Sequence, residues 1–241
     1  MEQDGKGEAK RALVRGIFGD IAPGYDAANC LMSLGRDRQW RRIVAARCAL
    51  GPGDRALDLC CGTGELSLAL AASAPGLSVV GLDFSPEMLS LARRKAEAAG
   101  ESGRFEFVEG DATRLPFPEA SFDAVTVGWG LRNVPDLDAT VREMVRVARP
   151  GALVASIDMG HPAHPLIARA YWGISRLFVP AVGRLVAGNA EAYRYLHESS
   201  RVFIDQGELA RRFRDQGLVE VRVRNFLGGA VALVEGRKPS S

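Results

Sequence analysis

One short stretch, residues 57–65, constrains the fold of this chain more than any other. The apolar run 55–59 is followed directly by Gly62-Thr63-Gly64 and then by an amphipathic helical pattern over residues 66–72. This order predicts a buried strand, a tight glycine turn and a helix whose first N–H groups are free to bind a ligand. We therefore expect an α/β fold with a nucleotide-like molecule lying across the turn.

The residues around this turn favour a sulfonium cofactor over a dinucleotide. A dinucleotide-binding turn needs a third glycine, and Ser67 stands in its place. The acids Asp58 and Glu65 beside the turn suit a cation better than a pyrophosphate. S-adenosylmethionine carries an ammonium and a sulfonium but no phosphate, so it is the predicted ligand. An ordinary strand–helix turn is the alternative.

Two later strands are also expected to end in carboxylates. Residues 78–83 read as a strand ending at Asp83, about twenty residues beyond the turn, where a carboxylate can accept hydrogen bonds from a ribose. Ser85 is a good cap for a helix that begins at Pro86. Residues 105–112 alternate like a strand ending near Asp111, which either accepts from an adenine amino group or caps a turn toward Thr113.

The rest of the pattern predicts a parallel sheet covered by helices on both faces. Strands are expected at 122–127 and 152–158, a helix at 138–148, and an antiparallel hairpin over 218–235 at the sheet edge. In such sheets a ligand lies outside the carboxyl ends of the strands. The residues expected around that crevice are Asp58, Asp83, Asp111 and Arg132.

Composition excludes several other classes of protein. The chain has 241 residues, is 47% hydrophobic and 25% charged, and carries a net charge of +2, which argues against a dedicated nucleic-acid surface. No apolar run approaches the roughly twenty residues that span a bilayer. The four cysteines lack the spacing of a zinc site, so no metal is expected and a cytoplasmic location is predicted. We expect a flexible start over residues 1–15 and a single domain over 16–241.

Beyond the glycine turn, three narrower blocks resemble the C-methyltransferases of respiratory quinone synthesis, which act on demethylmenaquinol and on the corresponding ubiquinone precursor. The blocks are Phe18-Gly19-Asp20-Ile21-Ala22-Pro23-Gly24-Tyr25-Asp26, Gly130-Leu131-Arg132-Asn133-Val134, and Tyr193-Arg194-Tyr195-Leu196 with Glu198-Ser199. The resemblance extends from about residue 18 to residue 238. It implies a Rossmann-like class I methyltransferase fold with a seven-stranded sheet, S-adenosylmethionine as cofactor and a lipophilic quinol as substrate.

The resemblance also implies which residues form the site. Arg132 and Asn133 are expected to face the quinol, and Tyr25-Asp26 to fold over the cofactor. The expected cofactor contacts are Asp58, Gly62, Thr63, Gly64, Asp83, Asp111, Ala112 and Gly128.

Methylation of a quinol ring carbon sets requirements of its own. Loss of the neighbouring hydroxyl proton pushes charge onto that carbon, so a base and an oxyanion stabiliser are needed. Arg132 stays protonated and cannot be the base, but it can stabilise a phenolate or hold a water, with Asn133 orienting the same oxygen. Alternatively, Arg132 pairs with Asp136 and Asn133 caps the turn. The base is left open among Asp158, His161, His164 and His197.

Residues 163–200 are expected to form a helical lid. One face of the pattern is apolar, with Arg169 and Arg176 opposite, and Pro180 and Gly183 predict breaks. This apolar face either packs on the sheet or lines a channel for a polyprenyl tail, and the arginines are candidates for contact with anionic lipid. A homodimer is left open. The apolar residues are Leu166, Ile167, Ala170, Tyr171, Ile174, Leu177 and Phe178.

Departures from the family pattern concentrate on the substrate side. Val234 and Arg237 stand where a histidine and a tyrosine are usual, Ile204 replaces a customary proline, and residues 158–161 read Asp-Met-Gly-His. The acceptor therefore stays open between demethylmenaquinol, which we favour, the ubiquinone precursor and another small phenolic or polyketide compound. Instead of an enzyme, the chain could also be a non-catalytic binding module. The presence of Arg132 and of the strand-end acids argues against this alternative.

Overall fold

The computed structural model describes residues 2–240, with side chains described at residue 10 and from residue 12 onward. Its centre is a seven-stranded sheet of order β3-β2-β1-β4-β5-β7-β6, in which β7 runs antiparallel to both of its neighbours. This confirms the predicted mostly parallel sheet with a C-terminal antiparallel hairpin. The strands are β1 Arg55–Leu59, β2 Ser78–Asp83, β3 Phe105–Glu109, β4 Phe122–Gly128, β5 Ala148–Met159, β6 Val219–Phe226 and β7 Val231–Arg237.

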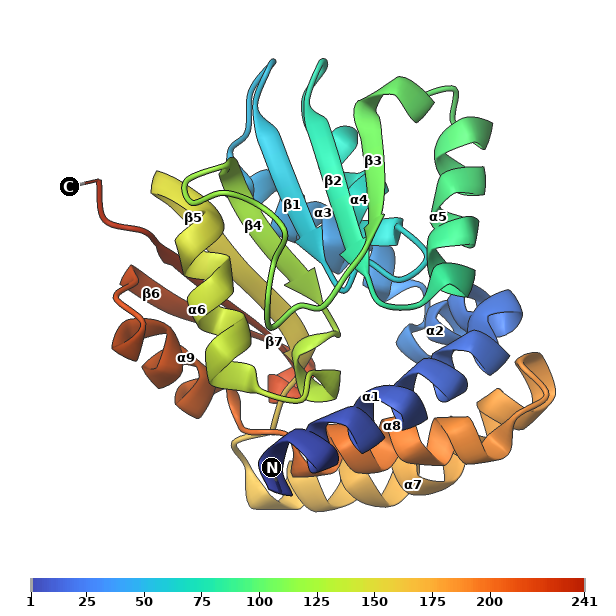
Figure 1. The fold of residues 1–241 in the computed structure, drawn as a ribbon. Coiled ribbons are helices and arrows are strands. Elements are labelled where there is room, and N and C mark those ends of the chain that lie inside the picture. The colour runs from blue at the N-terminus through green and yellow to red at the C-terminus, as the bar shows by residue number, and fades with distance from the viewer. Residues whose placement is uncertain (1, 241) are drawn as a thin grey trace.

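Both faces of the sheet are covered because successive side chains of each central strand point to opposite faces, and most of them are buried on both faces. Leu57 and Leu59 of β1 belong to a core under α6 (Leu137–Val147) and α9 (Gln206–Asp215). Ala56 points to the opposite core, under α3 (Arg36–Cys48) and α4 (Glu65–Ala71). Figure 1 shows α6 and α9 in front of the sheet and α3 and α4 behind it, while α5 (Pro86–Ala98) lies beside β3.

Four further helices form a layer beyond the carboxyl ends of the parallel strands. They are α1 (Glu2–Ile21), α2 (Tyr25–Ser33), α7 (Pro165–Val186) and α8 (Ala190–Val202), and α1, α7 and α8 lie together below the sheet in Figure 1. They share a small core that includes Ile21, Val182 and Tyr193. At Gly183 the helices approach so closely that a Cβ would lie 2.3 Å from the Tyr193 ring. This layer covers the edge of the sheet where a ligand is expected.

The N-terminal residues, for which a flexible start is expected, lie in helix α1, which begins at Glu2. Tertiary contacts account for the helix: Val14 is buried, and Lys10 Nζ donates a hydrogen bond to the Val134 carbonyl at 2.6 Å. The flexibility of these residues stays a prediction.

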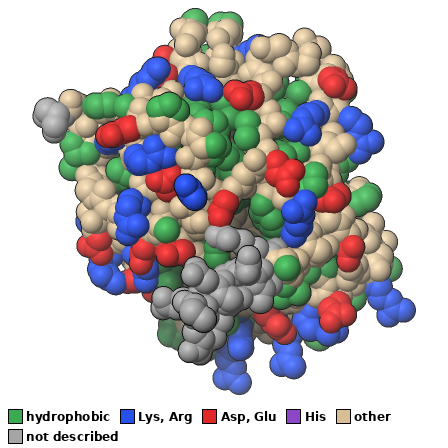
Figure 2. Space-filling view, in the orientation of Figure 1, with side chains coloured by type: hydrophobic (Ala, Val, Ile, Leu, Met, Phe, Trp, Pro, Cys, Tyr) green, Lys and Arg blue, Asp and Glu red, His purple; other side chains and the backbone are tan. Residues whose placement is uncertain are grey.

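Two expectations for the lid segment are corrected. Helix α7 continues through Pro180, because its packing against α8 holds it across the proline. Its apolar face does not pack on the sheet: Leu166, Ile174 and Leu177 are each at least two-thirds exposed. Figure 2 shows Lys and Arg side chains projecting from the lower edge of the molecule, where Figure 1 places α7 and α8.

Candidate active site

Two cavities lie between the carboxyl ends of the strands and the helical layer. The larger has a volume of about 710 Å³ and lies between the ends of β1 to β4 and helix α1. The smaller, of about 190 Å³, is enclosed by α2, α3, α7 and α8. Tyr25 and Trp129 line both cavities. The two cavities therefore adjoin each other at these two aromatic side chains.

Asp83 anchors the glycine turn to the end of β2. Its Oδ2 accepts a hydrogen bond from the Gly62 amide at 2.8 Å, and its Oδ1 accepts from the Ser85 amide at 2.9 Å. Burial raises the pKa of Asp83, and these amide donors oppose the rise. Asp83 and Gly62 both line the larger cavity, as the sequence predicts. The carboxylate retains unused lone pairs there, which can accept from a ribose.

Three residues expected at the cofactor shape the turn and line neither cavity. Asp58 points to the face of the sheet where Ser67 of α4 donates to its Oδ2 at 2.6 Å. Thr63 Oγ1 donates to Asp26 at 2.6 Å, and Gly64 begins α4 with a φ of 80°. Their direct contact with a cofactor stays a prediction.

The Asp58–Ser67 pair also explains why the third glycine is absent from the turn. Ser67 supplies a hydroxyl to a carboxylate that is completely buried, which glycine cannot do. Burial raises the pKa of Asp58 to about 7, and its Oδ1 has no hydrogen-bond partner in the part of the chain that the structure describes. A buried carboxylate oxygen left unsatisfied suits a cationic ligand group arriving nearby.

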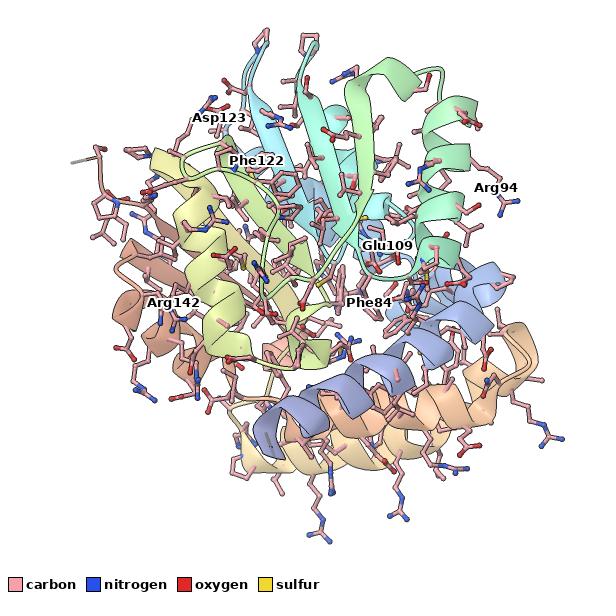
Figure 3. All side chains as sticks on the ribbon, in the orientation of Figure 1. Phe84, Arg94, Glu109, Phe122, Asp123 and Arg142 are labelled. Carbon is pink, nitrogen blue, oxygen red and sulfur yellow. The ribbon has the colours of Figure 1, made fainter. Side chains whose placement is uncertain are left out.

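The far end of the larger cavity is formed by residues after β2 and β3. Asp111 and Ala112 line it. Asp111 Oδ1 accepts from the Thr113 amide and hydroxyl, each at 2.8 Å, so the turn-cap alternative is confirmed, while contact of Asp111 and Ala112 with the cofactor stays a prediction. Phe84 and Glu109, labelled in Figure 3, lie at these strand ends and line the same cavity. Sequence reasoning missed Phe84, although an aromatic residue directly after a strand-end acid is a usable signal for a stacking surface.

The end of β4 is a constrained turn between the two cavities. Gly128 lines the larger cavity, and Trp129 has a φ of 56°, an uncommon backbone conformation for a side chain of this size. A Cβ at Gly130 would lie 2.5 Å from the Cβ of Cys60. The turn therefore packs closely against the side chains of Cys60 and Val127.

Arg132 follows this turn and lines the smaller cavity. Its Nη1 donates to Asp158 Oδ1 and to the Trp129 carbonyl, each at 2.6 Å. The alternative pairing with Asp136 is wrong, because Asp136 caps α6 by accepting from the Ala139 amide at 2.9 Å. Arg132 Nε and Asp158 Oδ2 have no partner among the described residues.

The charges of this pair influence each other strongly. Burial raises the pKa of Asp158, and the nearby guanidinium opposes that rise. Burial disfavours the charged form of Arg132, but the charge and hydrogen bond of Asp158, together with Tyr25 and Tyr195, outweigh it and raise the pKa of the guanidinium. Arg132 is therefore a permanent cation at the wall of the smaller cavity.

Asn133 lines the larger cavity, although it is the next residue in the chain. Its Oδ1 accepts from the Tyr195 hydroxyl and its Nδ2 donates to the Trp129 carbonyl, each at 3.4 Å. The expected Arg132–Asn133 pair therefore stands across the boundary between the cavities. A reacting group at this boundary could contact both side chains.

The four candidate bases differ in their position relative to the two cavities. Asp158 lines neither cavity, and His161 Nε2 is hydrogen-bonded to the Phe203 carbonyl at 2.9 Å. His164 is exposed at the start of α7. His197 lines the smaller cavity.

The smaller cavity is lined by several aromatic side chains and has a polar end. Tyr171, Trp172 and Trp129 contribute rings, and the buried ion pair between Arg41 and Asp37 lies in its wall. The Arg41 guanidinium lies 5.0 Å from the centre of the Trp129 ring. In the run 36–42 these buried residues alternate with exposed ones, so the run is partly a solvated helix face and partly a cavity wall.

S-adenosylmethionine fits the larger cavity by chemistry and size. Carboxylates stand at the strand ends where ribose and adenine would bind, and Phe84 offers a ring face. Among the described residues no cluster of three or more histidine, cysteine or acidic side chains could hold a metal ion. The two cavities together suit a cationic cofactor in one and an aromatic substrate in the other.

Solved structures with low sequence identity share this fold. A SAM-dependent methyltransferase from Aquifex aeolicus superposes with a TM-score of 0.58 at 18% identity, covering 81% of this chain and 88% of the other. Phosphoethanolamine N-methyltransferase 2 of Haemonchus contortus, in complex with S-adenosyl-L-methionine, gives a TM-score of 0.60 at 16% identity, covering 83% and 52%.

Sequence relatives are much nearer. The chain is 45% identical to a demethylmenaquinone methyltransferase of Desulfitobacterium hafniense, over 98% of this chain and 94% of the relative. It is 39% identical to that of Geobacillus kaustophilus, over 96% and 99%, and 44% identical to that of Mycobacterium marinum, over 94% of each. Residues 5–238 match the ubiE/COQ5 methyltransferase family, and the chain therefore belongs to this family of enzymes.

Proposed function

We propose that this enzyme transfers a methyl group from S-adenosylmethionine to a ring carbon of demethylmenaquinol. The observation that carries the proposal is the meeting of the two cavities at Tyr25 and Trp129, with the cation Arg132 in the wall of the aromatic one. The names of the relatives described above support the same acceptor. A quinol ring in the smaller cavity could present one edge to a cofactor in the larger cavity.

Positioning is the first contribution of this chain to the reaction. When bound, S-adenosylmethionine supplies an electrophilic methyl group on its sulfonium. Asp83 and the turn that it anchors hold the ribose end, while Tyr25 and Trp129 confine the gap between the two ligands. Alignment of donor and acceptor removes much of the barrier to a displacement of this kind.

Charge stabilisation is the second contribution. The ring carbon becomes nucleophilic as its neighbouring hydroxyl loses a proton, and the resulting oxyanion needs a fixed cation. Arg132 is fixed by Asp158 and by the Trp129 carbonyl, so it costs no reorganisation when the charge develops. Asn133 stands beside it at the boundary between the cavities and can orient the same oxygen.

The size of the smaller cavity determines how much of the proposed substrate it can hold. A volume of about 190 Å³ lies below the roughly 300–1,000 Å³ of typical small-molecule pockets, so it can hold a head group but not a long tail. Phe178 and Leu227 line the cavity and are also exposed, at 41% and 50%. The tail therefore leaves the cavity past these two side chains.

Around that exit the surface suits an anionic bilayer. Leu166, Ile174 and Leu177 of α7 are exposed, and residues 159–190 contain no Asp or Glu. Arg169, Arg176 and Arg184 are exposed on the same helix. Apolar side chains flanked by arginines are typical of helices that lie at a membrane surface. In the part of the chain that the structure describes, no helix could cross a bilayer. The enzyme therefore takes its substrate from the membrane surface through α7.

The function is tested by mass spectrometry of the quinones of a strain that lacks this enzyme. We expect demethylmenaquinone to accumulate and menaquinone to return when the gene is restored. Purified enzyme with S-adenosylmethionine should methylate reduced demethylmenaquinone in vitro. A normal menaquinone pool in the deletion strain, or faster methylation of the ubiquinone precursor in vitro, would contradict the proposed acceptor.

Membrane contact is tested by sedimentation with vesicles of phosphatidylglycerol or of phosphatidylcholine. The variant Arg169→Gln/Arg176→Gln/Arg184→Gln should lose binding to the anionic vesicles. The control Arg94→Gln/Arg114→Gln/Arg142→Gln removes the same charge from exposed sites away from α7 and should bind like the wild type. Unchanged binding of the α7 variant would refute the lipid contact.

A further inference from the structure

His197 is the histidine that faces the proposed acceptor. It lies on α8, is 8% exposed, and lines the smaller cavity together with Arg132, Tyr171 and Trp172. The centre of its ring lies 5.9 Å from that of Trp172, in an edge-to-face arrangement. The ring is therefore held against the cavity wall by packing.

Ser175 lies within hydrogen-bond distance of one nitrogen of this ring, Nδ1. Ser175 Oγ lies 3.2 Å from His197 Nδ1 and 3.3 Å from the Trp172 carbonyl. When the Ser175 hydroxyl donates to this carbonyl, its oxygen is free to accept from Nδ1–H, and the lone pair of the neutral imidazole then lies on Nε2.

The surroundings of His197 keep the imidazole neutral. Burial lowers its pKa, and the cations Arg201 and Arg176 lower it further, against the opposing effect of Glu198. The charged or titratable groups facing the cavity from the other elements are Tyr25 of α2, Asp37 and Arg41 of α3, Arg132 after β4, and Tyr171 of α7. Of these, Asp37 and Arg41 neutralise each other in their ion pair, and Arg132 is paired with Asp158.

The other candidate proton acceptors near the smaller cavity are less suitable, because they are hydrogen-bonded to other groups or are already protonated. Asp158 accepts from Arg132 and from the Met159 amide at 2.7 Å and lines neither cavity. The Nε2 atom of His161 is hydrogen-bonded to the Phe203 carbonyl. The tyrosines are ordinarily protonated at neutral pH, and burial raises the pKa of Tyr25 and Tyr171 further.

We propose that His197 is the general base of the reaction, taking the acceptor's hydroxyl proton on Nε2, with Ser175 as the positioning residue that fixes its tautomer. This rests on the function proposed above and deepens it by assigning the proton. As the ring carbon bonds to the methyl group, the electron pair of the broken S–CH₃ bond stays on sulfur and the hydroxyl proton moves to Nε2. The hydrogen on the methylated carbon then leaves to water as a proton. His197 returns its proton to the ring oxygen, so one proton is released per turnover.

The test measures kcat and KM from pH 5 to pH 9 with a short-chain demethylmenaquinol that needs no membrane. His197→Asn keeps a donor for Ser175 but lacks Nε2. We expect its kcat to fall by about 10²–10⁴-fold while KM changes little, because a general base acts in the transition state. The wild-type kcat should fall on the acid side of the profile, below the ordinary histidine pKa of about 6.5, and the variant should lose this limb.

Matched variants separate a chemical role from a structural one. His164→Gln, at an exposed histidine, should keep both the rate and the acid limb. Ser175→Ala should lower kcat by a smaller factor than His197→Asn while retaining the limb. His197→Gln provides a second substitution if the asparagine variant does not fold. Near-wild-type kcat in a folded His197 variant, or a reduced kcat that keeps the acid limb, would overturn the proposal.

A readout without substrate keeps this proposal separate from the proposed function. In protein labelled with ¹⁵N-histidine, His197 should show the neutral tautomer with the proton on Nδ1 at pH 7.5. The opposite tautomer would overturn the assignment of the base. A wild-type enzyme that fails to methylate demethylmenaquinol while showing the expected tautomer would instead refute the proposed acceptor.

Discussion

The guanidinium Nη1 of Arg132 donates to Oδ1 of Asp158 at 2.6 Å, in an ion pair whose side chains are 6% and 3% exposed. The two residues come from different strand ends, β4 and β5, and meet beside the smaller cavity. The pair fixes a cation where the proposed reaction develops negative charge. Each of the two charges also depends on the other, because a buried charge left without its partner would destabilise the folded protein.

Removal of one partner of this pair should affect both stability and turnover. Asp158→Leu leaves the Arg132 charge buried and unpaired, so the free energy of unfolding should fall by about 3–5 kcal/mol. Arg132→Met/Asp158→Leu should recover much of that loss in urea unfolding, yet stay inactive. Recovery of turnover in the double variant would contradict the role of Arg132 as oxyanion stabiliser.

Arg132→Ala separates cofactor binding from catalysis. Arg132 does not line the larger cavity, so the affinity for S-adenosylmethionine, measured by isothermal titration calorimetry, should survive. Turnover should fall by about 10²-fold or more, the scale found when one oxyanion-stabilising group is removed. If Arg132→Ala lost its affinity for S-adenosylmethionine while the cofactor-bound variant kept its turnover, this expectation would be contradicted.

Asp83→Ala should collapse cofactor affinity. The carboxylate binds the Gly62 and Ser85 amides as well as lining the larger cavity, so its removal loosens the turn and removes the ribose acceptor together. Calorimetry should show a loss of about 10²-fold or more, since hydrogen bonds to a charged group contribute about 1.5–3 kcal/mol each. Glu97→Ala, at an exposed acid of α5, is the control and should bind normally.

Gly130→Ala should disrupt the turn after β4. The added Cβ would lie 2.5 Å from Cys60 Cβ and 2.9 Å from Val127 Cγ2, so the backbone must move. We expect a lower melting temperature and a loss of turnover, because this turn carries Trp129 and Arg132. Gly103→Ala is a suitable control, since a Cβ there meets nothing within 4 Å. Equal melting temperatures for the two variants would show that the turn adjusts freely.

The stability of the cofactor-free protein should depend on Asp58 and pH. Burial raises the folded-state pKa of Asp58 to about 7, whereas an unfolded chain has a value of about 3.9. Between these values the folded protein holds a proton that the unfolded chain releases, so stability falls as pH rises.

Asp58→Asn removes this titration. The wild type should lose on the order of 2–4 kcal/mol more unfolding free energy than the variant between about pH 4 and about pH 7. Denaturant unfolding at both pH values measures the difference. Parallel pH dependence of the two proteins would show that Asp58 stays ionised in the folded protein.

The local patterns of the sequence determined the order of elements and the donor side of the site. Alternating and helical periodicities predicted the strands and the glycine turn, because both depend on neighbours a few residues apart. Gly62, Asp83, Asp111, Ala112 and Gly128 line the larger cavity for the same reason: the carboxyl ends of parallel strands meet at one edge.

Only the tertiary structure decided which side chains meet. Arg132 pairs with Asp158 across 26 residues rather than with the nearby Asp136, and Lys10 reaches the Val134 carbonyl across 124 residues. In the folded protein Asp58 also accepts a hydrogen bond from Ser67, and His197 lies in the wall of the smaller cavity. Sequence spacing carries no information on such pairs, because the packing of distant elements brings them together. The glycine turn therefore identifies the cofactor, while the surroundings of the acceptor are created by the fold.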